Sequence, residues 1–275
     1  MGREIAESAA SAESTELGPK LVVAGVGKIF ASSEPIVAVQ DFNFEVLPGE
    51  FVVILGPSGC GKTTVLRMIA GLEAPSTGEI LMDGELVEDP GPDRGMVFQS
   101  YTSFPWLTVK KNILMGLRFR QDINRSESSE LADYYIELVG LKDFANSYPK
   151  HLSGGMRQRV AIARTLAAKP DVLLMDEPFG ALDSQTRSSM QEELVRIQDQ
   201  HHTTVVFVTH DIEEAIFLAD RIVISSSRPA HVRDIIDVES HGLPRPRDTE
   251  TKFSPEFSAL KSHLHHLIHS ESEGA

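Results

Sequence analysis

With 275 residues and 41% hydrophobic side chains, the chain is long enough to bury the core of one large domain or of a domain with an added lobe. Its net charge of -14 argues against nucleic acid as a partner, because phosphate contacts need clustered Lys and Arg, and against adhesion to anionic lipid. A single cysteine excludes an internal disulfide and fits a reducing cytoplasm, and no window approaches the ~18 uninterrupted apolar residues of a membrane span.

The N-terminal part of the chain reads as a polar leader followed by strands and one glycine-rich turn. Residues 1–19 contain no apolar stretch and predict a short, acidic, disordered leader. The segments 21–30 and 42–51 predict β-rich structure, and the apolar run 51–55 predicts a buried strand. The following helix is expected to end at Gly71, and Asp83-Gly84 predicts the turn of a hairpin.

Residues 100–150 change character and predict a helical subdomain, because they are helix-prone and alternate poorly as strands. The residues beyond 228 are rich in proline and histidine and give the weakest pattern, although KSHLHHLIHS (261–270) predicts a solvated amphipathic helix. Between these regions we expect a helix from about Gly155 to Lys169-Pro170, a buried parallel strand over 172–175, a helix over 184–200, a strand over 204–208, a short helix after Asp211 and a strand over 221–225.

Residues 56–63, GPSGCGKT, match the phosphate-binding loop G-x-x-x-x-G-K-[ST] in the context it requires, after a strand and before a helix. Backbone N–H groups and the helix N-terminus suit a β-phosphate, the Lys62 ammonium suits the β- and γ-phosphates, and the Thr63 hydroxyl suits Mg2+. A glycine-rich turn that matches by chance is the alternative. Within the loop, Cys60 is either an oxidation-sensitive thiol at a helix N-terminus or a small packing residue.

The motif VLLMDEP (172–178) places Asp176 and Glu177 at the end of a buried strand. In an open α/β sheet, ligands gather at that end of the strands. Asp176 would hold Mg2+ directly or through water, and Glu177 would orient and deprotonate the attacking water. The alternative is an acidic cluster that starts a helix, which the presence of the phosphate loop makes a poor explanation.

Together with LSGGMRQ (152–158), these motifs resemble in order and spacing the ATP-binding cassette (ABC) ATPases. The resemblance covers residues 20–228. It implies an α/β P-loop NTPase (RecA-like) core with an N-terminal antiparallel β subdomain, a helical subdomain inserted at about 100–160, and a short C-terminal extension over 229–275. It further implies that Gln99 is the Q-loop glutamine, Ala181-Leu182-Asp183 the D-loop, His210 the switch histidine and Phe30 the aromatic residue that stacks on adenine.

The resemblance also implies a dimer of two ATPase subunits, the chain with itself or with a paralogue. Ser153, Gly154, Gly155 and Asp183 would then reach the ATP of the other subunit. The alternative for the LSGG motif is an ordinary Ser N-cap with loop glycines. In the same subunit, ATP would contact Phe30, Gly56, Pro57, Ser58, Gly59, Cys60, Gly61, Lys62, Thr63, Thr64, Gln99 and Asp176, with Thr63, Gln99 and Asp176 on Mg2+ and with Glu177 and His210 as catalytic residues.

The segment GPDRGMVFQSYTSFPWLTVKKNI (91–113) resembles the ATPase subunits of bacterial importers for nitrate, sulfonates and taurine. In such importers this region receives a coupling helix of the transmembrane permease, and Tyr101, Phe104 and Trp106 are candidate docking residues. Phe104 and Trp106 packing inside the helical subdomain is the equal alternative. The resemblance implies a cytoplasmic protein held at the inner membrane face by the permease and supplied indirectly by a substrate-binding protein. Too few residues follow Arg228 for the β-rich regulatory domain of some other importer ATPases.

Two other function classes are weaker explanations. A soluble ABC ATPase associated with nucleic acid or ribosomes would carry a long coiled coil between Lys62 and Ser153, or two cassettes, and the acidity of the chain argues against both. A nucleotide-binding regulator without turnover would not need Glu177 and His210. The sequence does not specify the transported anion.

Overall fold

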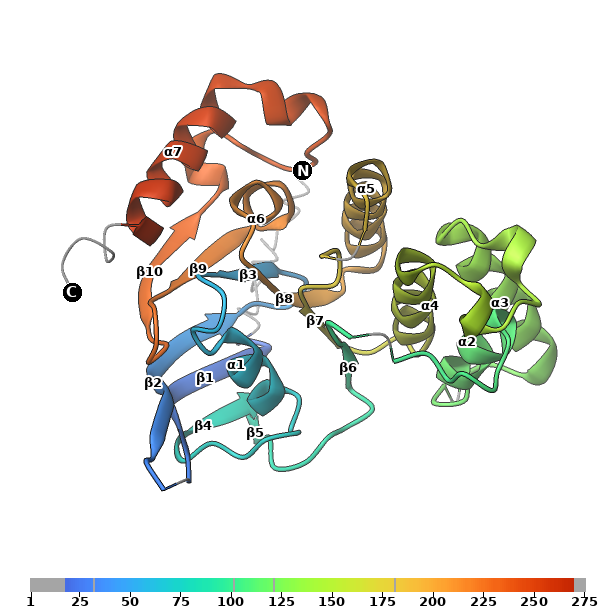
Figure 1. The fold of residues 1–275 in the computed structure, drawn as a ribbon, viewed down its shortest axis with the longest axis horizontal. Helices are drawn as coiled ribbons and strands as arrows, with labels where there is room; N and C mark the ends of the chain where they lie inside the picture. Colours follow the sequence, from blue (N-terminus) through green and yellow to red (C-terminus); the bar gives the residue numbers. More distant parts are fainter. Residues whose placement is uncertain (1–17, 32, 101, 121, 181, 270–275) are drawn as a thin grey trace, which may run out of the picture.

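Two β-sheets and a separate group of helices make up the computed structural model, which describes residues 18–269 except 32, 101, 121 and 181. In Figure 1 the sheets lie together and the helices α2, α3 and α4 project to one side. This is the α/β arrangement predicted from the sequence. The leader expected over residues 1–19 falls almost entirely outside the described residues.

The larger sheet has six strands in the order β10-β9-β3-β8-β7-β6. All neighbours pair in parallel except β10, which runs antiparallel to β9. Strands β3, β7 and β8 are buried along their whole length, as expected for parallel strands covered on both faces. The bounds are β3 (Phe51–Leu55), β6 (Arg94–Val97), β7 (Val172–Asp176), β8 (Thr204–Thr209), β9 (Arg221–Ser225) and β10 (Val232–Asp237).

The two faces of this sheet contribute to two hydrophobic cores. Val52 and Ile54 of β3 pack in a core with α1 and the smaller sheet, whereas Val53 and Leu55 pack in a core with the other helices. This alternation follows from the two-residue period of a strand. The helices α1 (Lys62–Ile69), α5 (Ser184–His201) and α6 (Ile212–Leu218) follow the strands β3, β7 and β8 in the chain, as the sequence predicted.

The smaller sheet is antiparallel, with the order β2-β1-β4-β5. Its β4–β5 turn has Asp83 and Gly84 at φ 51° and 80°, the left-handed pair of the predicted hairpin. Strand β2 also reaches the larger sheet region, where Val39 forms a bridge with Ala230. The bounds are β1 (Leu21–Phe30), β2 (Ile36–Val46), β4 (Thr77–Met82) and β5 (Glu85–Leu86).

Residues 109–167 form a helical arm composed of α2 (Val109–Leu117), α3 (Arg125–Leu138), two short helices and α4 (Gly154–Ala167). Thr108 caps α2, and Asn124 starts α3 with a capping box. Helices α2 and α4 approach closely at Gly116, where an added Cβ would lie 2.1 Å from the Arg164 carbonyl oxygen. Helix α4 leads back to β7 and therefore connects the arm to the sheet.

The chain after residue 228 packs onto the core. It supplies β10 and the predicted amphipathic helix α7 (Pro255–His269), whose Phe257, Leu260 and Leu264 are buried in the core shared with α6. The buried Arg247 guanidinium donates to the carbonyl oxygen of Ala219 at 2.6 Å, directly after α6. Within residues 18–269 as described, no helix is both long and apolar enough to cross a membrane.

Candidate active site

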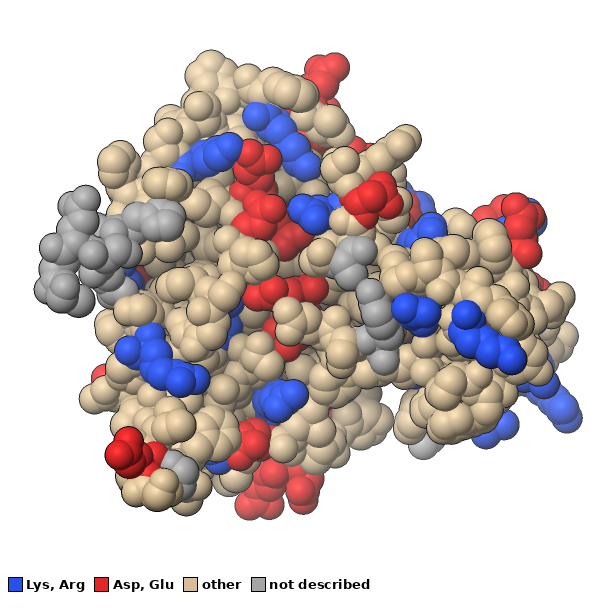
Figure 2. Space-filling model, in the orientation of Figure 1, with Lys and Arg blue, Asp and Glu red and all other residues tan. Residues whose placement is uncertain are grey.

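The strand order brings four predicted segments to one edge of the larger sheet. Strand β8 lies between β3 and β7, so the loop after β3, the acidic residues that end β7 and the histidine after β8 meet at neighbouring carboxyl ends. The segment after β6 reaches the same edge, because β6 pairs with β7 in parallel. Acidic side chains gather at the centre of the face shown in Figure 2, between α1 and α6.

The phosphate loop is shaped by glycines. Gly61 has φ 130°, and a Cβ at this residue would lie 2.6 Å from the Ala38 carbonyl oxygen. No other residue type fits both the backbone conformation and this close approach to β2. The Lys62 ammonium donates to the carbonyl oxygens of Gly56 and Pro57 at 2.8 and 2.7 Å, so it spans the loop.

The remaining loop residues differ in exposure. Ser58 and Gly59 are exposed at the tip, and Thr64 is half-buried at the start of α1. Cys60 is buried, with its Sγ 3.6 Å from the Ser225 Oγ. The burial of Cys60 favours its packing role over that of an accessible thiol.

Thr63 and Asp176 form a pair of oxygen donors beside the loop. The Thr63 hydroxyl donates to Asp176 Oδ1 at 3.0 Å. Burial raises the pKa of Asp176, and the Thr63 hydrogen bond opposes that rise. A buried carboxylate next to a hydroxyl is a hard oxygen donor set, which is the kind that Mg2+ prefers. These two residues therefore fit the predicted magnesium site.

Glu177 is held by two other predicted residues. The Gln99 Nε2 donates to Glu177 Oε2 at 3.3 Å, and the His210 Nδ1 lies 3.1 Å from the same oxygen. Glu177 itself has φ 42°, a left-handed conformation that is rare for a residue with a side chain and is found at functional sites. Its backbone N–H donates to the Val208 carbonyl oxygen at 3.0 Å, which fixes this conformation against β8. The carboxylate is thus oriented from three neighbouring strand ends.

Comparison with known proteins identifies the family of the chain. The ABC transporter family profile matches residues 39–180, just over half of the chain. The chain belongs to the ABC transporter ATP-binding family. Like the other members of that family, it is an ATPase.

Two curated relatives and one solved structure show how far the similarity extends. The nitrate import ATP-binding protein of Synechocystis sp. is 44% identical over 90% of this chain and 94% of its own length. The aliphatic sulfonates import ATP-binding protein of Bacillus cereus is 46% identical over 86% of this chain and 91% of its own length. An ATP-binding cassette solved as a dimer in a post-hydrolysis state with ADP and Pi superposes with a TM-score of 0.72 at 35% identity, covering 79% of this chain and 98% of that one. The predicted resemblance to the nitrate and sulfonate import ATPases is confirmed.

Ser153 and Asp183 are among the residues predicted to reach the ATP of another subunit. Ser153 is exposed and caps α4, accepting from the Met156 N–H at 3.3 Å. Asp183 is exposed and caps α5. Its carboxylate accepts a hydrogen bond from the Thr186 N–H, and this hydrogen bond lowers the pKa of Asp183. In the part of the chain that the structure describes, no hydrogen bond or ion pair joins Ser153 or Asp183 to Lys62. Within one subunit, these residues act as helix caps.

The aromatic residues predicted to dock a membrane subunit divide into two environments. Phe104 is half-buried under the Arg164 guanidinium, 4.9 Å from its ring centre, whereas Trp106 is 70% exposed. Tyr101 lies outside the described residues. Phe30 is partly exposed at the end of β1, with the Lys28 ammonium 5.3 Å from its ring centre. Phe104 therefore fits the alternative of packing inside the helical subdomain, whereas Trp106 is exposed enough to contact a partner.

One residue with a clear place in the site was not singled out from the sequence. Gln158 of the signature segment is 1% exposed, and its Nε2 donates to the Phe98 carbonyl oxygen at 3.2 Å, next to Gln99. It therefore ties the signature helix α4 to the glutamine that contacts Glu177. The available signal was its helical spacing from Ile162 and Thr165, which places a polar side chain on the buried face of α4.

Proposed function

We propose that this ABC ATPase is the motor subunit of an importer for small anions of the nitrate, sulfonate or taurine type. The observation that supports the chemistry best is the Glu177 carboxylate, held by Gln99 and His210 next to the Thr63–Asp176 pair. The similarity to nitrate and sulfonate import proteins over nearly the whole chain supports the transport role. The pairing of catalytic geometry with these relatives favours an importer over a soluble ABC ATPase.

In this proposal the residues divide the work of phosphoryl transfer. Phosphoryl transfer depends mainly on positioning and charge neutralisation. Lys62 and the loop N–H groups bind the phosphates, and Glu177 orients the attacking water and accepts its proton. Gln99 and His210 hold the carboxylate through Oε2, which leaves Oε1 without a hydrogen-bond partner in the described part of the chain and available to accept from the attacking water. Thr63, Asp176 and Gln99 would hold Mg2+, which supplies positive charge to the phosphates when bound.

The proposal includes a head-to-tail dimer. The exposed N-terminus of α4, with Ser153, Gly154 and Gly155, is an anion-binding arrangement that has no role in the chain's own phosphate loop. A second subunit, either the same chain or a paralogue, would place this N-terminus on the γ-phosphate. Asp183 would approach the same interface.

Ser153→Asp tests this dimer against the simpler role of a helix cap. Aspartate is as good an N-cap as serine, so the fold is preserved, but its charge would repel the γ-phosphate of the partner's ATP. We expect unchanged ATP binding by each subunit, no ATP-dependent dimer in size-exclusion chromatography with light scattering, and a loss of turnover. Ser153→Asn, a neutral cap, is the matched control. If the Ser153→Asp protein dimerises and hydrolyses ATP normally, Ser153 acts only as the N-cap of α4.

A membrane subunit would dock beside Trp106. An apolar groove of about 330 Å³ lies here between the arm and the larger sheet, lined by Phe104, Met115, Phe119 and Arg164 among others. Phe119 is 67% exposed, so it and Trp106 offer aromatic contacts to a partner. This groove supports a permease partner that holds the protein at the inner face of the membrane.

Co-purification tests this docking. Trp106→Ala should reduce recovery of the permease encoded with this chain at least tenfold in mild detergent. Phe253→Ala, which removes an 84% exposed aromatic ring on the C-terminal segment, should leave recovery unchanged. Uptake of nitrate, an alkanesulfonate and taurine by proteoliposomes with the cognate substrate-binding protein then identifies the anion. Uptake of none of them would refute the small-anion assignment.

A further inference from the structure

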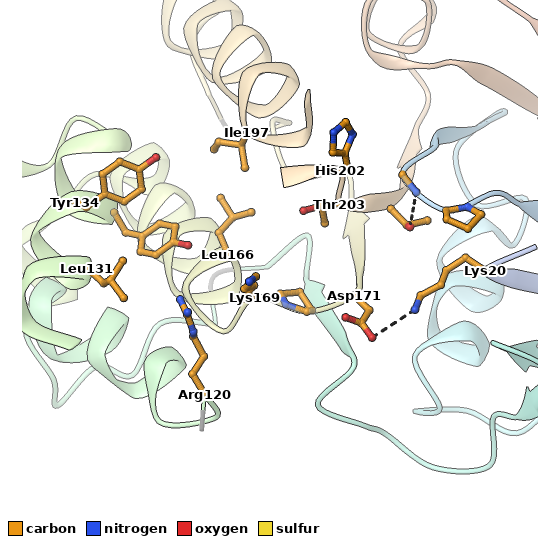
Figure 3. A pocket seen from close by; sticks show the side chains of 15 residues that line it. Lys20, Arg120, Leu131, Tyr134, Leu166, Lys169, Asp171, Ile197, His202 and Thr203 are labelled. Carbon is orange, nitrogen blue, oxygen red and sulfur yellow. Dashed lines mark hydrogen bonds and ion pairs between the residues drawn. The ribbon is translucent and has the colours of Figure 1, made fainter. Parts of the chain in front are cut away.

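A cavity of about 560 Å³ lies at the edge of the larger sheet opposite the active site. Its wall includes Asp171 and Thr203, which directly precede β7 and β8, whereas the catalytic residues follow the same strands. Figure 3 shows residues of the helical arm on one side of the cavity and residues of the core on the other. A molecule bound here would contact both bodies. The labelled arm residues are Arg120, Leu131, Tyr134 and Leu166, and the labelled core residues include Lys20, Asp171 and Ile197.

Basic side chains outnumber carboxylates in this cavity, although the whole chain has a net charge of -14. Lys20 pairs with Asp171 at 3.4 Å, and Arg120 pairs with Asp122 at 2.6 Å. The Lys169 ammonium, in contrast, forms no hydrogen bond or ion pair with any residue that the structure describes. The ionisable groups in the wall, tyrosines aside, are Lys20, Arg120, Lys169, His202 and Asp171.

Two of the basic residues occupy backbone conformations that favour glycine. Lys169 follows α4 with φ 52°, and His202 ends α5 with φ 48°. The corresponding residues after α1 and α3 are Gly71 and Gly140. The chain therefore keeps a basic side chain at the two helix ends that border the cavity, where glycine would be less strained. A positive charge at a helix C-terminus also offsets the helix dipole, but the dipole does not explain the third polar group of the cavity, the hydroxyl of Tyr135.

Tyr135 presents its hydroxyl to the open space of the cavity. Its side chain lines the cavity and only 8% of the residue is exposed, yet its hydroxyl makes no hydrogen bond with the described residues. Burial raises the pKa of Tyr135, so the phenol stays protonated and can donate. Because this hydroxyl is not one of the shielded polar atoms of the described residues, it is free to donate to a molecule bound in the cavity. The neighbouring wall is apolar, formed by Leu131, Leu166 and Ile197.

We propose that this cavity binds a small organic anion. Its oxyanion head, a carboxylate, phosphate or sulfonate, accepts from the Lys169 ammonium and the Tyr135 hydroxyl, and its apolar body packs against Leu131, Leu166 and Ile197. The volume suits a ligand of that size. The bound anion ties the arm to the core and thereby slows ATP turnover. Binding itself does not depend on the proposed transport role.

Calorimetric titration of the Mg-ADP-saturated protein tests the site, because the nucleotide blocks the phosphate loop. The probes are benzoate, phenyl phosphate and benzenesulfonate. Inorganic phosphate and sulfate serve as oxyanions that lack an apolar group. We expect at least one aromatic probe to bind saturably and about tenfold more tightly than either inorganic ion.

Variants locate the binding. Tyr135→Phe removes only the unpartnered hydroxyl and should weaken binding about fivefold, and Lys169→Gly, which also relieves the left-handed backbone, should weaken it about tenfold or more. Lys111→Gln, which removes an exposed charge on α2, is the control and should not change affinity. No saturable binding up to roughly 10 mM would overturn the site, as would unchanged affinity in both cavity variants. Binding that leaves ATP turnover unchanged would overturn the regulatory part.

Discussion

The two edges of the larger sheet differ in how their polar groups are satisfied. At the carboxyl edge, Lys62 donates to two loop carbonyl oxygens, Thr63 pairs with Asp176, and Glu177 is held by two side chains. At the amino edge, the Lys169 ammonium and the Tyr135 hydroxyl line a cavity and form no hydrogen bond or ion pair within the described part of the chain. The catalytic edge is therefore organised by its own residues, whereas the exposed Lys169 and the Tyr135 hydroxyl at the other edge remain open to the cavity.

The difference has a topological cause. Parallel strands deliver their following loops to one edge, so the residues after β3, β7 and β8 meet there and can hydrogen-bond to one another. The opposite edge receives the C-terminal ends of α4 and α5, which come from different bodies of the molecule. Polar groups at such a junction face a space between bodies. The predictions below test each edge in turn.

The largest expected effect is the loss of turnover in Glu177→Gln. The amide keeps the contacts with Gln99 and His210 but cannot accept a proton from water, so the rate constant should fall about 10²–10⁴-fold while ATP still binds. Phosphate release and fluorescent nucleotide titration measure the two quantities. Glu130→Gln, at an exposed position of α3, is the control and should retain the parent's rate. Equal activity in both variants would remove Glu177 from its role as base.

The second largest effect concerns the backbone of the catalytic edge. Gly61→Ala combines a φ of 130° with a Cβ 2.6 Å from the Ala38 carbonyl oxygen, so the free energy of unfolding should fall by about 2–4 kcal/mol. Gly84 also has a left-handed φ, but an added Cβ there would meet open space. Gly84→Ala should therefore lower the free energy of unfolding by only about 1 kcal/mol. Urea titrations compare the two. Equal costs would mean that the loop adjusts freely and that the glycine is not required by close approach.

A smaller effect is expected for the connection between the signature helix and the catalytic edge. Gln158→Leu removes the hydrogen bond to the Phe98 carbonyl oxygen and fills a similar volume. We expect turnover to fall about three- to tenfold, with a change of about 1 kcal/mol or less in the free energy of unfolding. Gln200→Leu, exposed on α5, is the control. A loss of stability in proportion to the loss of turnover would indicate a packing role alone.

The smallest effect concerns a buried carboxylate near the catalytic edge. Burial raises the pKa of Glu214, so its charged form costs the native state stability, and that cost appears as pH rises through the raised pKa. Glu214→Gln keeps the hydrogen bond from Gln191 and should raise Tm by roughly 1–3 °C at pH 8. Below the ordinary glutamate pKa of about 4.3 the difference in Tm between the variant and the parent should vanish, because Glu214 is then protonated in both the folded and the unfolded protein. Calorimetry at the two pH values measures it.

Much of the fold and of the catalytic edge was predictable from the sequence. Buried parallel strands read as continuous apolar runs, so β3, β7 and β8 were predicted within one residue of their bounds. The phosphate loop and the acidic strand end carry motifs whose residue types are dictated by phosphate and metal chemistry. Local sequence therefore contained the information for Lys62, Thr63, Asp176 and Glu177.

The remainder depends on contacts between distant segments. Gln158 finds the Phe98 carbonyl oxygen 60 residues away, and this partner follows only from how α4 packs. The cavity between the arm and the core likewise combines Lys20, Tyr135 and His202, which no local pattern relates. The segment after 228 gave little periodicity, although it contributes β10 and a buried face of α7.

The most direct test of the whole account is the molar mass of Glu177→Gln with and without nucleotide, measured by light scattering. With Mg-ATP, slow hydrolysis should trap the sandwiched dimer, so the mass should be twice 30.2 kDa, and with Mg-ADP or no nucleotide it should be 30.2 kDa. The combined variant with Ser153→Asp should remain a monomer in every condition. A monomer in Mg-ATP would contradict a dimer of the chain with itself, and a dimer that forms without ATP would contradict the whole account.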